Sequence, residues 1–253
     1  MKWIRQQTLE GKLLAGTFLN LGSSVTAEIA GIVGFDFAVL DLEHGTGDRP
    51  QLVSQLQALE ASKTAPLVRI QWNDMPTFKR ILDLGPSGIM VPYVCTPDEA
   101  RSAVASMRYP PAGVRGVAPS VRASGYGQNF AEYFETVNEG LLTVVQIETR
   151  EAVENAAEIA AVDGVDVLFV GPMDLSVSMG IPGQFDNADF RSTLTQVVSA
   201  AKKKGKVAGI LAQNTQQVAS YVDDGFTFVA CGADGAHVAR GFKEILQSFD
   251  ALR

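Results

Sequence analysis

The 253-residue sequence contains only two cysteines, Cys95 and Cys231, and two histidines. Two cysteines without a recognisable spacing are too few for a disulfide framework or a cysteine-ligated zinc site. Basic residues are outnumbered by acidic ones, so the formal net charge is −7, and no basic stripe occurs. We therefore expect neither nucleic acid nor an anionic membrane surface as a partner.

Long apolar runs are also missing. No run approaches the ~18 residues of a membrane-spanning helix, and residues 1–12 lack the apolar centre of a signal peptide. We expect a cytoplasmic protein. No lysine falls at the carboxyl end of a predicted strand, which argues against a Schiff-base mechanism, because that chemistry needs a buried lysine in the site.

What the sequence does contain is a regular alternation of short apolar runs with longer amphipathic stretches. Continuous apolar strands separated by helices are typical of a parallel sheet covered on both faces. Eight such units in ~250 residues favour a closed (β/α)8 TIM barrel over an open doubly wound sheet, and residues 1–253 are predicted to form one domain. The predicted strands are Leu13–Leu19, Phe37–Leu42, Pro66–Ile70, Gly88–Val94, Leu142–Glu148, Val165–Val170, Val207–Leu211 and Phe226–Cys231.

Two carboxylates occupy equivalent places on neighbouring predicted strands. Glu148 ends one strand, Asp174 follows the next after a Gly-Pro-Met turn, and residues 149–162 between them are predicted to form one helix. In a parallel sheet both acids would lie at the same edge. Two carboxylate ligands indicate a divalent cation, with magnesium or manganese favoured over zinc.

A salt bridge to Arg69 is the alternative to a metal. Arg69 ends an otherwise apolar strand and could pair with Glu148 and Asp174. One arginine cannot also neutralise the acids in Asp41-Leu42-Glu43-His44, which end another predicted strand, so a cation is still required. Arg69 itself either reaches the barrel rim to pair with an acid or stabilises a developing oxyanion, and we favour the second role.

Three further segments carry candidate functions. His44 follows a strand beside two acids, which favours a general base over a structural histidine, whereas His237 lies in a predicted helix without such neighbours. The segment Gly171–Ser176 is predicted to begin a helix whose free N–H groups would bind a substrate carboxylate. The Gly-, Pro- and Ser-rich stretch Tyr109–Gln128 is long for a connection and is either functional or an oligomer contact.

These residues, taken together with several longer stretches, resemble the HpcH/HpaI aldolase family of class II, metal-dependent pyruvate aldolases. The similarity extends from residue 16 to about 235. The stretches that carry it are Gly34-Phe35-Asp36, Asp41-Leu42-Glu43-His44, Leu82-Asp83-Leu84-Gly85, Gly88-Ile89-Met90-Val91-Pro92, Tyr109-Pro110-Pro111-Ala112-Gly113-Val114-Arg115-Gly116, Gln146-Ile147-Glu148-Thr149 and Val170-Gly171-Pro172-Met173-Asp174-Leu175-Ser176.

The resemblance implies a modified barrel of the phosphoenolpyruvate/pyruvate-domain type in which Glu148 and Asp174 bind Mg²⁺, Mn²⁺ or Co²⁺. It implies that His44, paired with Asp83, serves as or activates the base, and that Arg69 holds the ketone or enolate oxygen. The residues that it implies for substrate binding are Gln146, Gly171, Pro172, Met173, Asp174 and Leu211. Relatives of this kind are homohexamers, trimers of dimers that exchange a carboxyl-terminal helix.

The implied reaction is the reversible cleavage of a 4-hydroxy-2-oxo acid to pyruvate and an aldehyde. A citryl- or malyl-CoA lyase is the enzyme alternative, disfavoured because no basic patch would hold the nucleotide phosphates, and a non-catalytic 2-oxo-acid-binding barrel is the other. The aldehyde stays open between succinic semialdehyde, tartronic semialdehyde, lactaldehyde and glyceraldehyde. The chain has Phe18 where many relatives have tryptophan, and Leu42 and Met173 where they have glycine or alanine, so a relative's substrate does not transfer.

Overall fold

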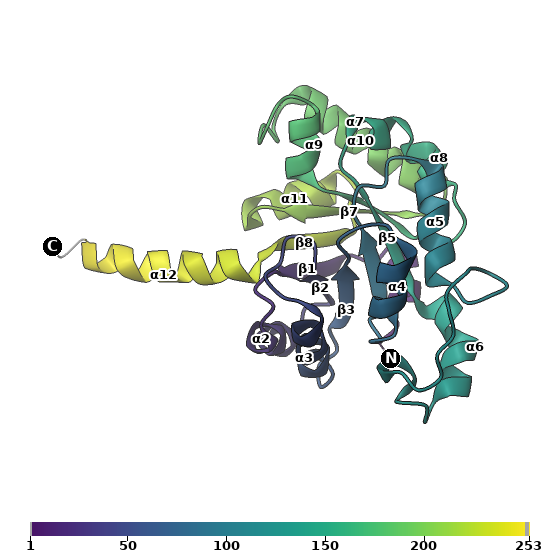
Figure 1. Ribbon diagram of the computed structural model, residues 1–253. Coiled ribbons are helices and arrows are strands. Elements are labelled where there is room, and N and C mark those ends of the chain that lie inside the picture. The colour runs from purple at the N-terminus through teal and green to yellow at the C-terminus, as the bar shows by residue number, and fades with distance from the viewer. Residues whose placement is uncertain (1, 251–252) are drawn as a thin grey trace.

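The computed structural model describes residues 2–250 and 253, and its eight strands form a closed parallel barrel in sequence order (Figure 1). Leu14 of the first strand pairs with Phe228 of the last, which closes the sheet. Every predicted strand is present within a few residues of its predicted bounds. The strands are β1 (Leu14–Leu19), β2 (Phe37–Asp41), β3 (Ala65–Arg69), β4 (Gly88–Val91), β5 (Leu142–Ile147), β6 (Val167–Val170), β7 (Val207–Ala212) and β8 (Phe228–Ala233).

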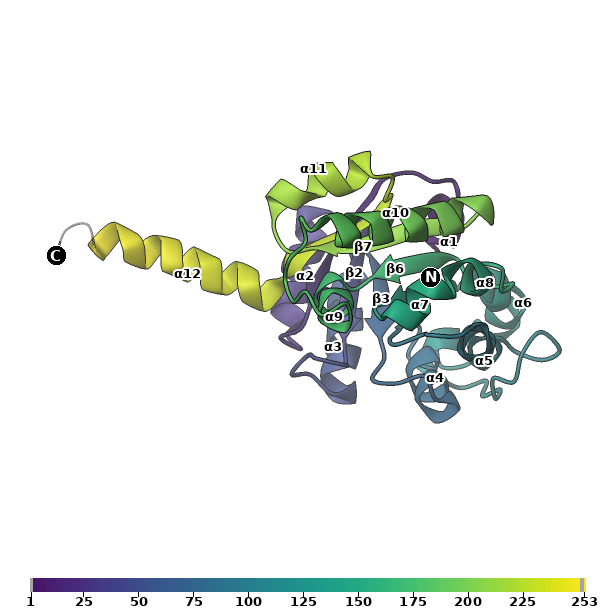
Figure 2. The same ribbon diagram turned by 90° about the horizontal axis from the view of Figure 1, so that it is seen from above.

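Helices alternate with the strands and surround the barrel, as expected for this fold (Figures 1 and 2). Two of them, α1 and α6, precede β1 and β5. The helices are α1 (Arg5–Leu9), α2 (Ser24–Val33), α3 (Arg49–Leu59), α4 (Met75–Leu82), α5 (Pro97–Met107), the 3-10 turn η1 (Arg122–Ser124), α6 (Phe130–Gly140), α7 (Arg150–Glu154), α8 (Ala156–Ala160), α9 (Pro172–Ser178), α10 (Ala188–Lys203), α11 (Thr215–Asp223) and α12 (Asp234–Asp250).

The prediction of one continuous helix over residues 149–162 was wrong. Two short helices, α7 and α8, meet at Asn155, whose side-chain amide donates a hydrogen bond to the Cys95 carbonyl oxygen at 2.8 Å. Asparagine side chains that bond elsewhere compete with helix continuation, which explains the break.

The barrel interior is filled by aromatic rings. The rings of Phe37 and Phe228 stack with centroids 3.9 Å apart, and Phe169 packs edge-on to Phe228. Gly16 makes room for them, because a Cβ at that position would lie 2.2 Å from the Phe37 ring. A second apolar layer between strands and helices includes Leu40, Val68, Ile89 and Val145. The barrel is therefore a packed core whose chemistry must lie at its ends.

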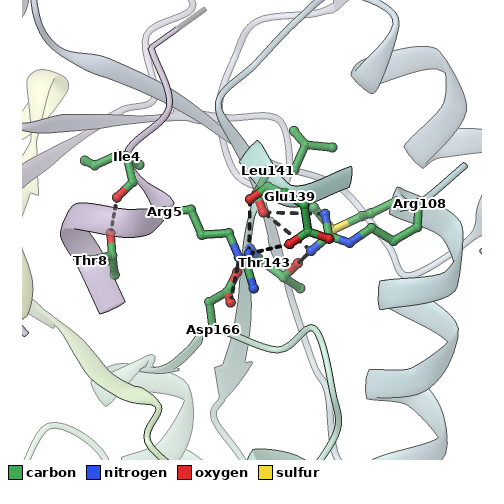
Figure 3. Close-up of polar contacts among 9 residues, drawn as sticks. Ile4, Arg5, Thr8, Arg108, Glu139, Leu141, Thr143 and Asp166 are labelled. Carbon is green, nitrogen blue, oxygen red and sulfur yellow. Dashed lines mark hydrogen bonds and ion pairs between the residues drawn. The ribbon is translucent and has the colours of Figure 1, made fainter. Parts of the chain in front are cut away.

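The amino end of the barrel is held by a buried ion pair (Figure 3). The Nε of Arg5 in α1 lies 3.0 Å from both carboxylate oxygens of Asp166, which is almost fully buried just before β6. Asp166 also accepts a hydrogen bond from the Thr143 N–H at 3.0 Å. This contact fixes α1 beneath the barrel, far from the strands' carboxyl ends.

The last helix, α12, projects from the barrel in both views (Figures 1 and 2). Its large apolar side chains Phe242, Ile245 and Leu246 are exposed. No helix among residues 2–250 and 253 is both long and apolar enough to cross a bilayer.

Candidate active site

Glu148 follows β5 at the carboxyl end of the barrel and is almost fully buried. Its Oε1 accepts a hydrogen bond from the Tyr93 N–H at 2.8 Å, and its Oε2 accepts one from the Gln146 side-chain amide at 2.9 Å. The β5–β6 register pairs Ile147 with Val170, so the next residue along β6, Gly171, lies beside Glu148. Hydrogen bonds from Tyr93, which follows β4, and from Gln146 in β5 therefore hold the carboxylate, and its Oε2 lies beside Gly171 at the start of α9.

Asp174 lies in the first turn of α9, on the next strand–helix unit, and is half-buried. Burial, followed by the negative charges of Asp174 and Glu43, raises the pKa of Glu148 to about 7. Burial raises the pKa of Glu43 as well. The predicted convergence of Glu148 and Asp174 is thus present as an electrostatic cluster of acids.

Arg69, the last residue of β3, is held by two other acids of this cluster. Its Nε and Nη2 donate to the Oδ1 and Oδ2 of Asp41 at 2.9 and 2.7 Å, and its Nη1 lies 3.1 Å from Glu43 Oε2. The described ion pairs of Arg69 do not include Glu148 or Asp174. Arginine carries five N–H groups, and the two that donate described hydrogen bonds both go to Asp41. The salt-bridge alternative to a metal therefore lacks a described contact.

His44 is on the loop after β2, with its side chain 67% exposed and its Nε2 4.0 Å from Glu43 Oε1. Its backbone N–H donates to Asp41 Oδ1 at 3.3 Å, as does that of Glu43 at 3.1 Å. Asp41 therefore orients both the loop that carries His44 and the guanidinium of Arg69.

Asp83 lies at the end of α4, which runs back from the carboxyl toward the amino ends of the strands. Its Oδ1 accepts a hydrogen bond at 3.3 Å from Arg115, which is fully buried and also donates to the Tyr133 hydroxyl at 3.0 Å. The described ion pairs of the two residues are with other partners, His44 with Glu43 and Asp83 with Arg115, so the implied His44–Asp83 pair is not among the described contacts.

The remaining implied substrate residues border the cluster. The side-chain amide nitrogen of Gln146 donates its hydrogen bond to Glu148. The buried Oε1 of Gln146 has no hydrogen-bond partner among the described residues. Pro172 is the first residue of α9, and the first backbone bond of that helix is donated by Leu175 to Gly171, so the N–H groups of Met173 and Asp174 are free of helix bonding. Leu211 packs from β7 against the barrel interior.

The sequence argument noted Asp41 and Glu43 only as acids at a strand end, and it missed Tyr93. The role of Asp41 in fixing Arg69 follows from the β2–β3 register, which pairs the two residues directly. Tyr93 contributes a backbone N–H to Glu148 from a left-handed conformation, φ 52°. Nothing in the sequence signals that conformation, because tyrosine rarely adopts it.

The residues present fit a divalent cation. A Cβ on Gly171 would lie 2.7 Å from Glu148 Oε2, so only glycine leaves this oxygen approachable from the α9 side. The neighbouring Gln146 also has a buried Oε1 without a hydrogen-bond partner among the described residues. Within residues 2–250 and 253, no three His, Cys, Asp or Glu side chains form a complete metal cage. Two oxygen ligands with open positions suit a hard cation that also binds substrate and water.

The chain matches known proteins over nearly its whole length. The model of the family described as HpcH/HpaI aldolase/citrate lyase matches residues 14–241. A 5-keto-4-deoxy-D-glucarate aldolase from Salmonella arizonae is 41% identical over 234 residues, which cover 92% of this chain and 91% of the relative.

Solved structures agree with this match. An HpcH/HpaI aldolase/citrate lyase family protein from Burkholderia cenocepacia J2315 superposes with a TM-score of 0.94 at 34% identity, covering 99% of this chain and 100% of the other. An HpcH/HpaI aldolase from Desulfitobacterium hafniense DCB-2 gives a TM-score of 0.91 at 29% identity, with 98% and 96% coverage.

Proposed function

Because this chain belongs to the HpcH/HpaI aldolase/citrate lyase family and is a carbon–carbon lyase, we propose that it cleaves a 4-hydroxy-2-oxo acid reversibly into pyruvate and an aldehyde. The observation that carries the proposal is the pair Glu148 and Asp174, two acids in one mouth whose described contacts leave them without an arginine partner. Burial raises the pKa of Glu148 to about 7, so its carboxylate is poorly compensated unless a cation is bound.

Glu148 and Asp174 would hold a divalent cation, with Mg²⁺, Mn²⁺ and Co²⁺ as the candidates. When bound, it supplies Lewis-acid polarisation of the substrate's ketone oxygen, an effect worth several kcal/mol in such sites. Gln146, with its free Oε1, and the N–H groups of Met173 and Asp174 border the place where the pyruvyl end of the substrate would lie.

The protein side chains then perform the proton transfer and charge stabilisation. His44, directly or through a water, removes the proton from the 4-hydroxyl group. The C3–C4 bond breaks, its electron pair forms the enolate of pyruvate, and the former C4 leaves as the aldehyde carbonyl. The guanidinium of Arg69 stabilises the enolate oxygen, and return of the proton to C3 gives pyruvate. Asp41 keeps the guanidinium in place.

Exchange of the methyl protons of pyruvate tests this proposal without an aldehyde. Protein stripped by a chelator and reloaded with Mg²⁺, Mn²⁺ or Co²⁺ should exchange these protons with deuterated water, as measured by proton NMR. Glu148→Ala should reduce the exchange rate by orders of magnitude. Absence of exchange with all three metals would refute the proposal.

We further propose that the protein is a homohexamer in which α12 is exchanged between subunits. The helix α12 leaves its own barrel (Figure 2). Its side chains Phe242, Ile245 and Phe249 are exposed, and so are Val25 and Ile32 of α2. Apolar faces of this size require a partner. Light scattering should give a six-chain mass for the wild type and a smaller one for Phe242→Asp, while an unchanged mass for this variant would contradict the exchange.

A further inference from the structure

Two exposed aromatic side chains stand together at the carboxyl end of the barrel. Trp72 follows β3 shortly after Arg69, and Tyr93 follows β4. Their ring centroids are 6.3 Å apart with an interplanar angle of 29°, and they are 59% and 43% exposed. Large aromatic rings are normally placed where they lose water contact, so an exposed stacked pair marks a binding surface.

Tyr93 links this pair to the reacting centre. Its backbone N–H donates a hydrogen bond to Glu148 Oε1 at 2.8 Å, so Tyr93 is in direct contact with the acid cluster. Burial, followed by the charges of Asp174, Glu148 and Glu43, raises the pKa of the Tyr93 phenol.

The backbone at Tyr93 is strained. A φ of 52° in a residue other than glycine costs on the order of 1–3 kcal/mol, and such conformations concentrate at functional sites. Glycine would adopt it without strain and would keep the N–H on Glu148. The presence of tyrosine there points to a use for its ring.

The charge near this pair restricts what it can bind. The one permanent cation in the described contacts of the cluster is Arg69, with which Asp41 and Glu43 already pair, and the other basic group, His44, lies 4.0 Å from Glu43. Neither Trp72 nor Tyr93 supplies a positive charge for a second carboxylate. Their π faces suit C–H groups, and the phenol suits a hydroxyl group.

We propose that Trp72 and Tyr93 form the acceptor wall, a surface that binds the chain of an uncharged, hydroxylated aldehyde beyond its carbonyl carbon. The inference rests on the proposed aldolase function and adds to it the class of aldehyde. The acceptor wall contacts the half of the substrate that becomes the aldehyde and leaves the pyruvate half to Glu148, Asp174 and Arg69.

The test compares two half-reactions in the same metal-loaded protein. Pyruvate proton exchange reports the site without an aldehyde, and aldol addition to acetaldehyde, butanal, erythrose and succinic semialdehyde reports the acceptor end. Wild type should use erythrose with the highest kcat/KM. Tyr93→Gly, which relieves the strained backbone, and Trp72→Ala should each lower kcat/KM for erythrose and butanal about tenfold. For Trp72→Ala, acetaldehyde should change less than about threefold and pyruvate exchange less than about twofold. For Tyr93→Gly, whose backbone N–H also contacts Glu148, the decisive value is the ratio of kcat/KM for erythrose to that for acetaldehyde, which should fall several-fold.

Tyr93→Phe isolates the phenol. It should lower kcat/KM for erythrose by up to about tenfold, the effect of one lost neutral hydrogen bond, and leave butanal unchanged. Tyr126→Phe is the matched control, because Tyr126 is also an exposed tyrosine at positive φ (55°) but lines a pocket with Pro66 and Ser87 at the amino ends of the strands. It should change none of these values.

Three results would overturn the acceptor wall. The first is an unchanged aldehyde profile in Tyr93→Gly and Trp72→Ala, and the second is a preference of the wild type for succinic semialdehyde. The third is a change in the oligomeric mass of Trp72→Ala with an unaltered profile, which would identify the pair as a subunit contact. Absence of pyruvate exchange in the wild type would instead refute the aldolase function itself.

Discussion

Replacement of Glu148 by glutamine should change how stability depends on pH in the metal-free protein. Burial holds the pKa of Glu148 at about 7 in the folded chain, against an ordinary value of 4.5. The folded protein therefore binds more protons than the unfolded chain between these values, and stability falls as the pH rises through this window. At about 1.4 kcal/mol per pH unit, the full penalty is about 3 kcal/mol above pH 7 and vanishes below 4.5.

Urea unfolding between pH 5 and 8, with a chelator present, measures this penalty. The free energy of unfolding of the wild type should fall by about 2.5 kcal/mol relative to Glu148→Gln across that range. The variant preserves local packing, because the amide of Gln146 can rotate to offer its unpartnered Oε1 to the new side-chain NH₂. In saturating Mn²⁺ the free energy of unfolding of the wild type should no longer fall with pH relative to Glu148→Gln. A bound cation compensates the carboxylate and stabilises the folded state by mass action.

The reasoning is refuted if the two metal-free proteins lose stability in parallel. A relative change below about 0.5 kcal/mol would mean that Glu148 is already compensated without metal, and the proposed need for a cation would lose its electrostatic basis.

Three further substitutions separate the roles of the two barrel ends. Asp41→Asn should lower kcat about 100-fold, because Arg69 loses its bidentate carboxylate, and should cost about 2 kcal/mol in the free energy of unfolding. Gly171→Ala should weaken Mn²⁺ binding at least about tenfold by calorimetry, since its Cβ would lie 2.7 Å from a Glu148 oxygen. Arg5→Ala should cost about 3 kcal/mol of stability by leaving the buried Asp166 without its cationic partner, with kcat unchanged.

Each of these substitutions has a control or a contrary result. Gly241→Ala, in an open position of α12, should not alter Mn²⁺ affinity. Lys12→Ala, which removes an exposed ion pair with Glu10, should change stability by less than about 1 kcal/mol. Wild-type kcat in Asp41→Asn would show that Arg69 is positioned without it, and a large loss of kcat in Arg5→Ala would mean that the amino end influences the chemistry.

The fold was predictable because its signal is repeated. Eight apolar runs at similar spacing define the same element eight times, so an error of two or three residues at one end, as in β4, does not change the architecture. The carboxyl-end position of Glu148 and Arg69 followed directly from that architecture. The helix break at Asn155 did not, because it depends on a hydrogen bond to Cys95, 60 residues away in sequence.

The finer geometry of the site depended on contacts between strands. The role of Asp41 requires the β2–β3 register, and the left-handed backbone of Tyr93 is set by the position of Glu148 on the next strand. Asp83 shows the opposite limit. A sequence motif located it, but its described ion pair is with Arg115, a contact between distant parts of the sequence that the motif does not reveal.

The closure of β1 on β8 has a consequence for biosynthesis. Leu14 cannot meet Phe228 until more than 200 further residues have been made, which takes about 10 to 40 s at roughly 5–20 residues per second. During that interval β1 has one edge without a partner, and the Phe37 ring lacks the Phe228 ring on which it stacks. A nascent chain of this protein therefore exposes a strand edge and an aromatic core, and its yield on expression should depend on chaperones that cover both until the last strand emerges.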